Sequence, residues 1–177
     1  MRVQEIVNNG MNAELAKKRV IRLVMIGMTG TGKSATGNSI LGSNDAFDPT
    51  LAFKSSARVC SKRGAIVNGT LQILVVDTPG VLDTEREEED IVDEIKKCID
   101  LSASGPHAFI MTISLSKRFT AGEYLPYEIF KKIFGEDLMK YVIICFTHAD
   151  LLEGTAVEEI LTTAPENLKK IMRKVKN

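Results

Sequence analysis

A glycine-rich stretch at residues 27–34 has the residue types and spacing needed to hold phosphate groups. It matches the pattern G-x-x-x-x-G-K-[ST] of a phosphate-binding loop. Its residues are Gly27, Met28, Thr29, Gly30, Thr31, Gly32, Lys33 and Ser34. Glycines permit positive φ angles and let main-chain N–H groups close around phosphate oxygens. Lys33 can reach the β and γ phosphates, and the Ser34 hydroxyl can coordinate Mg²⁺. We therefore expect this loop, with Ala35 in the helix that follows it, to bind a nucleotide.

A second candidate site element is the run Asp77-Thr78-Pro79-Gly80, which follows the apolar residues 71–76. A carboxylate at the end of a buried strand can hold Mg²⁺ through a water molecule. The main-chain N–H of Gly80 can contact a γ-phosphate in the same place. We therefore predict that Ser34 and Asp77 hold the metal ion and that Gly80 contributes to the nucleotide site.

A third element, Thr147-His148-Ala149-Asp150, ends another apolar run. The Asp150 carboxylate could accept hydrogen bonds from both the ring N–H and the exocyclic amine of guanine, a pattern that adenine cannot supply. Losing one buried pairing costs roughly 1–3 kcal/mol, so Asp150 would favour GTP and GDP over ATP. We interpret Thr147, His148 and Asp150 as base-recognition residues. An ordinary loop histidine is the alternative for His148, and an ATPase is the alternative for the protein.

The elements that must position these motifs alternate along the chain. The expected strands cover residues 20–26, 59–67, 70–77, 107–115 and 139–147, with Asn68-Gly69 as a hairpin turn. The expected helices cover residues 34–41, 83–99, 120–133 and 165–176. Such alternation predicts an α/β fold with a mostly parallel central sheet, one antiparallel edge strand and helices on both faces. The ligand is then expected at the carboxyl ends of the strands.

Charge balance, hydropathy and cysteine content argue against some classes of function. The chain has 177 residues, with 23 Lys and Arg against 23 Asp and Glu, so no net basic field favours nucleic acid. No apolar run approaches the ~20 residues of a membrane span. The cysteines, Cys60, Cys98 and Cys145, form no CxxC pair and no even framework, so we expect free thiols and a cytoplasmic protein. Contact with a cytosolic membrane face would need a segment that this sequence does not contain.

Two charged runs each have a structural interpretation and a functional one. The acidic start of the helix at residues 83–94 is typical of a solvated first turn, and metal binding is the alternative. The basic helix at residues 165–176 is typical of a solvated helix face, with a nucleic-acid or lipid surface as the alternative. Residues 1–19 are expected to be a loosely docked extension, and residues 43–58 a loop in the place of a nucleotide-sensing segment.

The motifs together resemble the immunity-associated nucleotide-binding GTPases, the AIG-type or GIMAP family, over about residues 20–152. The stretches that carry the resemblance are residues 32–42, 75–80, 105–108 and 118–120. The resemblance implies a P-loop NTPase G domain that binds GDP and GTP with Mg²⁺. It also implies a GTP-driven homodimer formed across the nucleotide face. Arg118 matches the arginine that acts across the dimer as a catalytic finger in some members; a surface arginine is the alternative.

Three departures from the family pattern bear on catalysis. Ala57 stands at the position of the family's switch threonine. Val81 follows Gly80 where Ras-like enzymes have the glutamine that orients water, so intrinsic hydrolysis should be slow. Family domains continue into a further strand and a fifth base-contacting motif, so we expect the G domain at residues 20–177 to stop before them. The hypotheses are a slow GTPase stimulated by homodimerisation, with Arg118 and Lys33 as catalytic residues, and a nucleotide-dependent scaffold with negligible hydrolysis.

Overall fold

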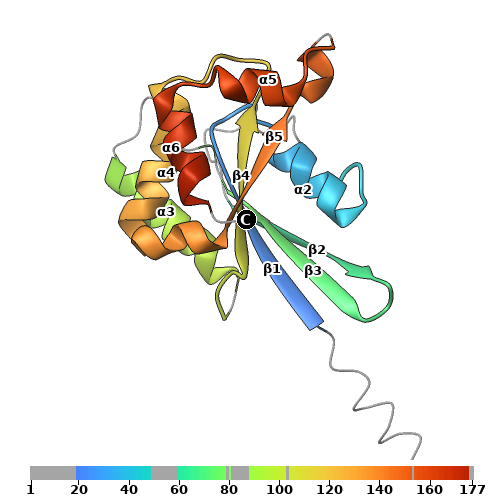
Figure 1. Ribbon diagram of the computed structural model, residues 1–177. Coiled ribbons are helices and arrows are strands. Elements are labelled where there is room, and N and C mark those ends of the chain that lie inside the picture. Colours follow the sequence, from blue (N-terminus) through green and yellow to red (C-terminus); the bar gives the residue numbers. More distant parts are fainter. Residues whose placement is uncertain are drawn as a thin grey trace, which may run out of the picture.

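A five-stranded sheet in the order β2-β3-β1-β4-β5 forms the centre of the protein (Figure 1). The computed structural model describes residues 19–48, 60–78, 80, 88–102, 104–152 and 154–175. The strands are β1 (Arg19–Ile26), β2 (Ser61–Val67), β3 (Leu71–Asp77), β4 (Ala108–Ser114) and β5 (Val142–Thr147). β1 is parallel to β3 and β4, and β4 is parallel to β5. β2 is antiparallel to β3. The predicted sheet, mostly parallel with one antiparallel edge strand, is confirmed.

The hairpin between β2 and β3 turns at the predicted dipeptide. Asn68 and Gly69 have φ angles of 50° and 70°. Three residues, 68–70, connect the paired residues Val67 and Leu71, and Asn-Gly adopts positive φ at little steric cost. The turn therefore sets the register in which Val67 faces Leu71 and Ser61 faces Asp77.

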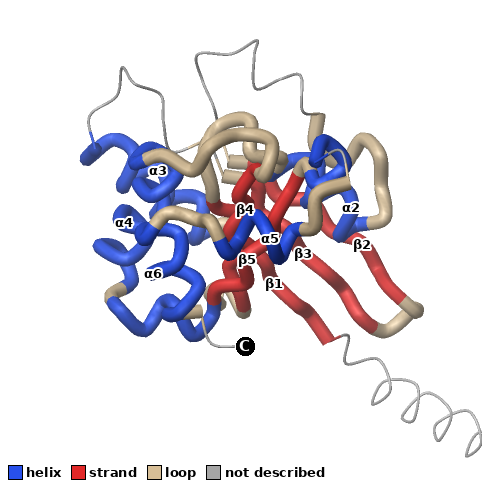
Figure 2. Tube along the Cα trace, turned by 45° about the horizontal axis from the view of Figure 1, so that its top comes forward, coloured by secondary structure: helices blue, strands red, loops and turns tan. Residues whose placement is uncertain are grey.

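Helices cover both faces of the sheet, as predicted (Figure 2). The helices are α2 (Lys33–Leu41), α3 (Glu88–Asp100), α4 (Ala121–Phe134), α5 (Val157–Thr162) and α6 (Glu166–Lys174), with the 3₁₀ segments η2 (Glu136–Tyr141) and η3 (Ala149–Leu152). The larger core joins one sheet face to α3, α4 and α6 through residues such as Val24, Ile95, Phe130 and Ile171. On the other face, the smaller core joins Met25, Val75 and Ile110 to Leu41 of α2.

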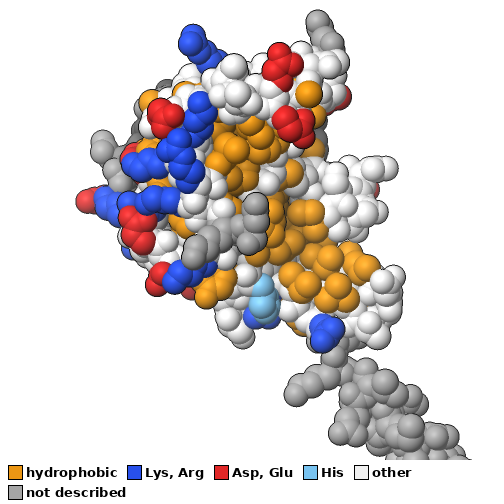
Figure 3. Space-filling model, in the orientation of Figure 1, with side chains coloured by type: hydrophobic (Ala, Val, Ile, Leu, Met, Phe, Trp, Pro, Cys, Tyr) orange, Lys and Arg blue, Asp and Glu red, His pale blue; other side chains and the backbone are white. Residues whose placement is uncertain are grey.

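The α2 face of the sheet remains partly open. Ile21 of β1 and Ile143 of β5 are 37% and 53% exposed. Figure 3 shows apolar side chains gathered over the strands β1 and β3 on the visible side of the molecule. Within the part of the chain that the structure describes, no helix is long and apolar enough to cross a membrane.

Local sequence signals mark the ends of two helices. Gly42 has φ 64° and ends α2, and its N–H donates to the carbonyl of Ser39 at 3.2 Å. At the start of α4, the Glu123 carboxylate accepts a hydrogen bond from the main-chain N–H of Thr120 at 2.6 Å. Glycine in the left-handed region and a Thr-x-x-Glu box satisfy main-chain groups that a helix leaves unpaired.

Two parts of the predicted element map are wrong. The fifth strand begins at Val142, because residues 136–141 form η2 after Gly135 ends α4. Leu138 and Met139 are buried from this segment, so their apolar character reflects packing in the larger core and not a strand. Helix α5 was also missed within a polar stretch. The basic helix α6 buries Leu168 and Ile171.

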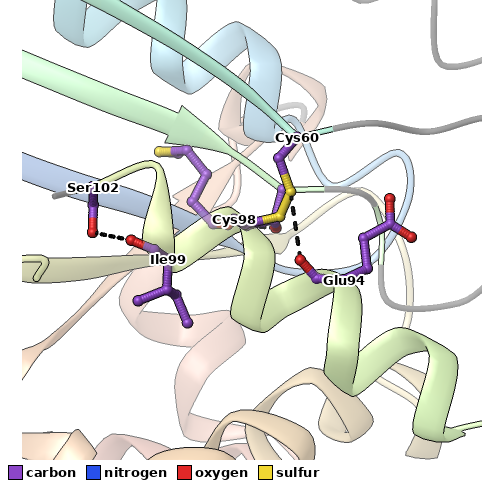
Figure 4. Close-up of a disulfide and its surroundings, with 7 residues drawn as sticks. Cys60, Glu94, Cys98, Ile99 and Ser102 are labelled. Atoms are coloured by element: carbon purple, nitrogen blue, oxygen red, sulfur yellow. Dashed lines mark hydrogen bonds between the residues drawn. A yellow bond between two sulfur atoms is a disulfide. The ribbon is translucent and has the colours of Figure 1, made fainter.

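The prediction of three free cysteines is wrong as well. Cys60, directly before β2, and Cys98, on α3, form a disulfide with 5.4 Å between their Cα atoms (Figure 4). The two residues are 38 positions apart, and the packing of α3 against the sheet brings them together. Cys145 is free and half-buried. Several other predictions, on residues 1–18, Ala57, Val81 and the acidic residues 83–87, lie outside the described residues.

Candidate functional site

The three predicted motifs meet at one edge of the sheet. Residues 27–32 follow the end of β1, Asp77 ends β3, and Thr147 ends β5. The parallel arrangement of these strands places their carboxyl ends on the same side. In open α/β sheets this edge is where ligands bind.

The phosphate loop depends on its glycines. Gly27, Gly30 and Gly32 have φ angles of 147°, 78° and 86°. A Cβ atom at Gly27 would lie 2.8 Å from the carbonyl oxygen of Thr112, so a larger residue there would displace the loop from β4. Positive φ allows successive main-chain N–H groups to turn toward one anion, as a phosphate-binding loop requires.

Lys33 is fixed over this loop. Its side chain is only 7% exposed. Its Nζ donates hydrogen bonds to the carbonyl oxygens of Met28 at 2.8 Å and Gly27 at 3.1 Å. A buried ammonium at the first turn of α2 supplies positive charge where the β and γ phosphates of a nucleotide are expected.

Hydroxyl groups tie the phosphate loop to the neighbouring strands. Thr147 Oγ1 donates to the carbonyl oxygen of Thr31 at 2.8 Å, which joins the first and third motifs. The hydroxyls of Thr31 and Thr112 lie 2.7 Å apart and are buried. The sequence prediction missed Thr112, although a polar residue in the middle of the apolar strand β4 was a usable signal.

Ser34 and Asp77 form the part of the site suited to a metal ion. The Ser34 hydroxyl donates to Asp77 Oδ2 at 2.7 Å. The other carboxylate oxygen, Oδ1, is buried and has no hydrogen-bond partner among the described residues. Burial raises the pKa of Asp77, while the hydrogen bond from Ser34 and the charge of Lys33 act against this rise.

These features fit Mg²⁺. A buried carboxylate oxygen without a partner is unfavourable unless a cation or an ordered water satisfies it. A hydroxyl and a carboxylate are hard oxygen donors, and Mg²⁺ in nucleotide sites takes few protein ligands because phosphates and water complete its shell. No group of three His, Cys, Asp or Glu residues suited to a metal occurs in the described ranges.

Gly80 brings the segment after β3 against the phosphate loop. A Cβ atom at Gly80 would lie 2.7 Å from the main-chain nitrogen of Thr29, so this position requires glycine. Thr78 Oγ1 donates to the carbonyl oxygen of Met25 at 2.7 Å and fixes the start of the segment to β1. This packing places Gly80 beside the phosphate loop.

The residues predicted to recognise the base lie partly beside the phosphate loop and partly at the surface. His148 has φ 58°, and its Nδ1 lies 3.1 Å from the hydroxyl of Ser114. Its ring lies beside the phosphate loop, because a Cβ at Gly32 would be 3.6 Å from His148 Cε1. Asp150 is the second residue of the segment η3 and is exposed, as is Ala35 on α2. The carboxylate of Asp150 is therefore accessible to a base.

Arg118 lies in the loop between β4 and α4 and is exposed. Its neighbour Lys117 approaches the phosphate loop more closely, since a Cβ at Gly30 would lie 3.9 Å from Lys117 Nζ. The sequence prediction missed Lys117, and no local pattern marked it. The loop thus carries one cation, Lys117, beside the phosphate loop of its own chain, and the next residue, Arg118, is exposed.

Replacing Asp77 with asparagine should separate the metal role from folding. A pKa that is raised on folding means that stability falls as the pH rises through the folded-state pKa. At pH 7 the Asp77 side chain carries a buried negative charge. The Asp77→Asn variant without ligands should therefore have a higher Tm than the parent, by about 2–4 °C for each kcal/mol gained in the free energy of unfolding. The further rise in Tm on adding Mg²⁺ with GDP should be lost. Thermal unfolding with and without Mg²⁺ measures both effects, and an undiminished Mg²⁺-dependent rise would contradict the assignment.

The element order, the phosphate loop after β1, Asp77 at the end of β3 and Asp150 after β5 define a P-loop GTPase G domain. Solved structures share this fold. Toc33 from Arabidopsis thaliana in complex with Mg²⁺ and GMPPNP aligns with a TM-score of 0.66 at 14% identity, over 97% of this chain and 68% of that one. A dimerization-deficient mutant of Toc33 aligns with the same TM-score. Era from Aquifex aeolicus bound to GDP·AlF4⁻ aligns at 0.53 with 19% identity, over 83% and 48% of the two chains.

The chain belongs to the AIG1 family, whose model matches residues 21–177. Immune-associated nucleotide-binding protein 7 of Arabidopsis thaliana is 32% identical over 165 residues, which are 92% of this chain and 53% of that protein. Immune-associated nucleotide-binding protein 3 of the same organism is 36% identical over 139 residues, 78% and 41% of the two chains. The chain thus spans about half the length of the curated relatives it matches.

Proposed function

We propose that this domain is a switch that binds GTP and GDP together with Mg²⁺. The observation that carries the proposal is the Ser34–Asp77 pair, in which one buried carboxylate oxygen has no hydrogen-bond partner among the described residues. The charge of Lys33 acts on the same carboxylate. The names of the relatives, which are nucleotide-binding proteins, and the Mg²⁺ and GMPPNP complex of Toc33 support it. Membership of the AIG1 family agrees with the same assignment.

Each part of the site has a role in this proposal. The main-chain N–H groups of residues 27–34 hold the phosphates, and Lys33 balances their charge. Ser34 and Asp77 hold Mg²⁺, which neutralises charge on the β and γ phosphates when bound. Gly80 packs against Thr29, and in this proposal its N–H contacts the γ-phosphate.

Specificity for guanine rests on Asp150 in this proposal. We expect Asp150→Ala to weaken GDP binding about 10–100-fold, since one buried charged pairing is worth roughly 1–3 kcal/mol. Binding of ADP, which is weak in the parent, should not change. Titrations with fluorescent GDP and ADP analogues measure both. Asp93→Ala removes an exposed carboxylate that pairs with Lys96 on α3 and is the matched control. Equal loss of GDP and ADP affinity would contradict base recognition by Asp150.

For the reaction, we propose slow hydrolysis of GTP by the monomer and faster hydrolysis by a homodimer formed across the nucleotide face. Arg118 is exposed in a loop that adjoins the phosphate loop, so it is available to the site of a second copy. The dimerization-deficient Toc33 mutant, in which an arginine is replaced by alanine, gives this arrangement a parallel in a protein of the same fold. GTP turnover per molecule should therefore rise with protein concentration in the presence of Mg²⁺.

A nucleotide-dependent scaffold with negligible hydrolysis is the second candidate. The observations that favour it are Val81 in place of a water-orienting glutamine and Ala57 in place of the switch threonine. The same turnover experiment separates the candidates. Retention of intact GTP for hours at concentrations where the protein is dimeric would favour the scaffold over the enzyme.

A further inference from the structure

The loop between β4 and α4 is fixed at its start to the third sequence motif. The main-chain N–H of Leu115 donates to the carbonyl oxygen of Thr147 at 2.9 Å. Ser114, the last residue of β4, has its hydroxyl 2.8 Å from the hydroxyl of Ser116 and accepts a hydrogen bond from the main-chain N–H of Ser116 at 3.3 Å. The same Ser114 oxygen lies 3.1 Å from Nδ1 of His148. These contacts anchor the first half of the loop.

The residue that follows this anchored stretch, Lys117, places its ammonium group beside the phosphate loop. A Cβ atom at Gly30 would lie 3.9 Å from Lys117 Nζ. Lys117 is exposed, and no carboxylate of the described residues forms an ion pair with it. Hydrogen bonds between an ammonium and a phosphate oxygen are strengthened by charge. An unneutralised ammonium at this position therefore suits a phosphate group.

The position of Gly30 indicates which part of the nucleotide lies beside this ammonium. The preceding residue, Thr29, packs against Gly80, which belongs to the γ-phosphate side in the proposed function. A Cβ atom at Gly32 would instead lie 3.6 Å from Cε1 of His148, on the base side. Gly30 lies between these two contacts in the chain. We therefore expect the α and β phosphates, which join the γ-phosphate to the nucleoside, at this position.

We propose that Lys117 binds the α and β phosphates of the nucleotide held by its own chain, as a second cation beside Lys33. This inference rests on the proposed function. Lys33 is buried and approaches the phosphates from within the loop, whereas Lys117 is exposed and approaches them from the solvent side. GDP and GTP share the α and β phosphates, so Lys117 contributes to the affinity for both. Because the contact is exposed, salt weakens it.

Ser114 is a positioning residue in this proposal. Its side chain is buried, and its hydroxyl contacts both Ser116, the residue before Lys117, and His148 of the third motif. Removing the hydroxyl releases the start of the loop and leaves the ammonium in place. The effect of Ser114 on nucleotide affinity should therefore depend on the presence of Lys117.

The test measures the affinity of the whole chain, kept dilute and with Mg²⁺, for a fluorescent GDP analogue and for GMPPNP. Lys117→Met removes the charge and keeps the length of the side chain. We expect both affinities to fall about ten-fold at ~0.05 M salt, and the loss to shrink at ~1 M salt, where exposed charges are screened. Lys117→Arg should retain most of the affinity because it keeps the positive charge. Lys96→Met removes an exposed ammonium that pairs with Asp93 on α3 and is the matched control.

A double-mutant cycle tests the positioning role. Ser114→Ala should weaken GDP binding about three-fold in the parent and should have no further effect in the Lys117→Met background, because residues that act through one another are not additive. A purely structural role of Ser114 would give the same loss in both backgrounds, and that result would overturn the positioning role.

The remaining outcomes separate this inference from the proposed function. Parental GDP affinity in Lys117→Met, or a loss confined to GMPPNP, would overturn the assignment of Lys117 to the α and β phosphates while the parent still binds GDP. A loss that appears only at concentrations where the protein is dimeric would place Lys117 at the site of a second copy and overturn the inference as well. Failure of the parent to bind the GDP analogue with Mg²⁺ would overturn the proposed function and this inference with it.

Discussion

Replacement of Arg118 by alanine should lower GTP turnover about 10³-fold at concentrations where the domain is dimeric, since an arginine finger typically contributes ~10³–10⁵ in rate. The guanidinium stabilises charge that develops on the transferred phosphoryl group. The monomeric site lacks this arginine and is therefore slow. At concentrations where the protein is monomeric, parent and variant should hydrolyse GTP at the same slow rate. Phosphate release measured against protein concentration gives both limits.

Two variants serve as controls for Arg118. Arg173→Ala removes an exposed arginine that pairs with Glu166 on α6, and its turnover should match that of the parent at every concentration. Lys117 lies beside Gly30 of its own chain, so any effect of Lys117→Ala should not vary with concentration. Two results together would contradict catalysis in trans and favour the scaffold. They are a parent turnover per molecule that does not change with protein concentration, and a turnover that does not change when Arg118 is replaced by alanine.

Replacement of Lys33 by alanine should weaken binding of GTP and GDP by at least about 100-fold, or roughly 3 kcal/mol. The ammonium is buried and held over the loop by the carbonyls of Gly27 and Met28. Its removal leaves the phosphates without their nearest cation in a site that excludes most water, where charges interact strongly. Isothermal titration with each nucleotide in the presence of Mg²⁺ measures the loss.

Lys140→Ala is the matched control for Lys33. Lys140 is exposed, and its charge pairs with Asp137 in η2, so its loss should leave nucleotide affinity within about two-fold of the parent because exposed ion pairs contribute little. Circular dichroism should show that both variants remain folded. A Lys33→Ala variant with parental affinity would mean that the loop does not bind phosphate as proposed.

Residues adjacent in the chain made several features predictable. The spacing of Gly27, Gly32 and Lys33 indicated a phosphate loop, and the structure has that loop, because backbone freedom and side-chain reach are local properties. Asn68-Gly69 and the Thr120–Glu123 box were predictable for the same reason: each meets a backbone requirement within a few residues. The 3₁₀ segment at residues 136–141 was not predictable, because an apolar run has no signal that separates a strand from a buried 3₁₀ turn.

The amino-acid sequence by itself determined the class of fold and the motifs that end β1, β3 and β5. Only the tertiary structure decided which distant groups meet there. It joined Thr147 to Thr31, aligned Ser34 with Asp77 and brought Lys117 toward Gly30. It also paired Cys60 with Cys98 where their spacing predicted free thiols. These contacts depend on sheet register and on how α3 packs against the sheet, which arise from the sum of many weak apolar contacts and leave no pattern in the neighbouring residues.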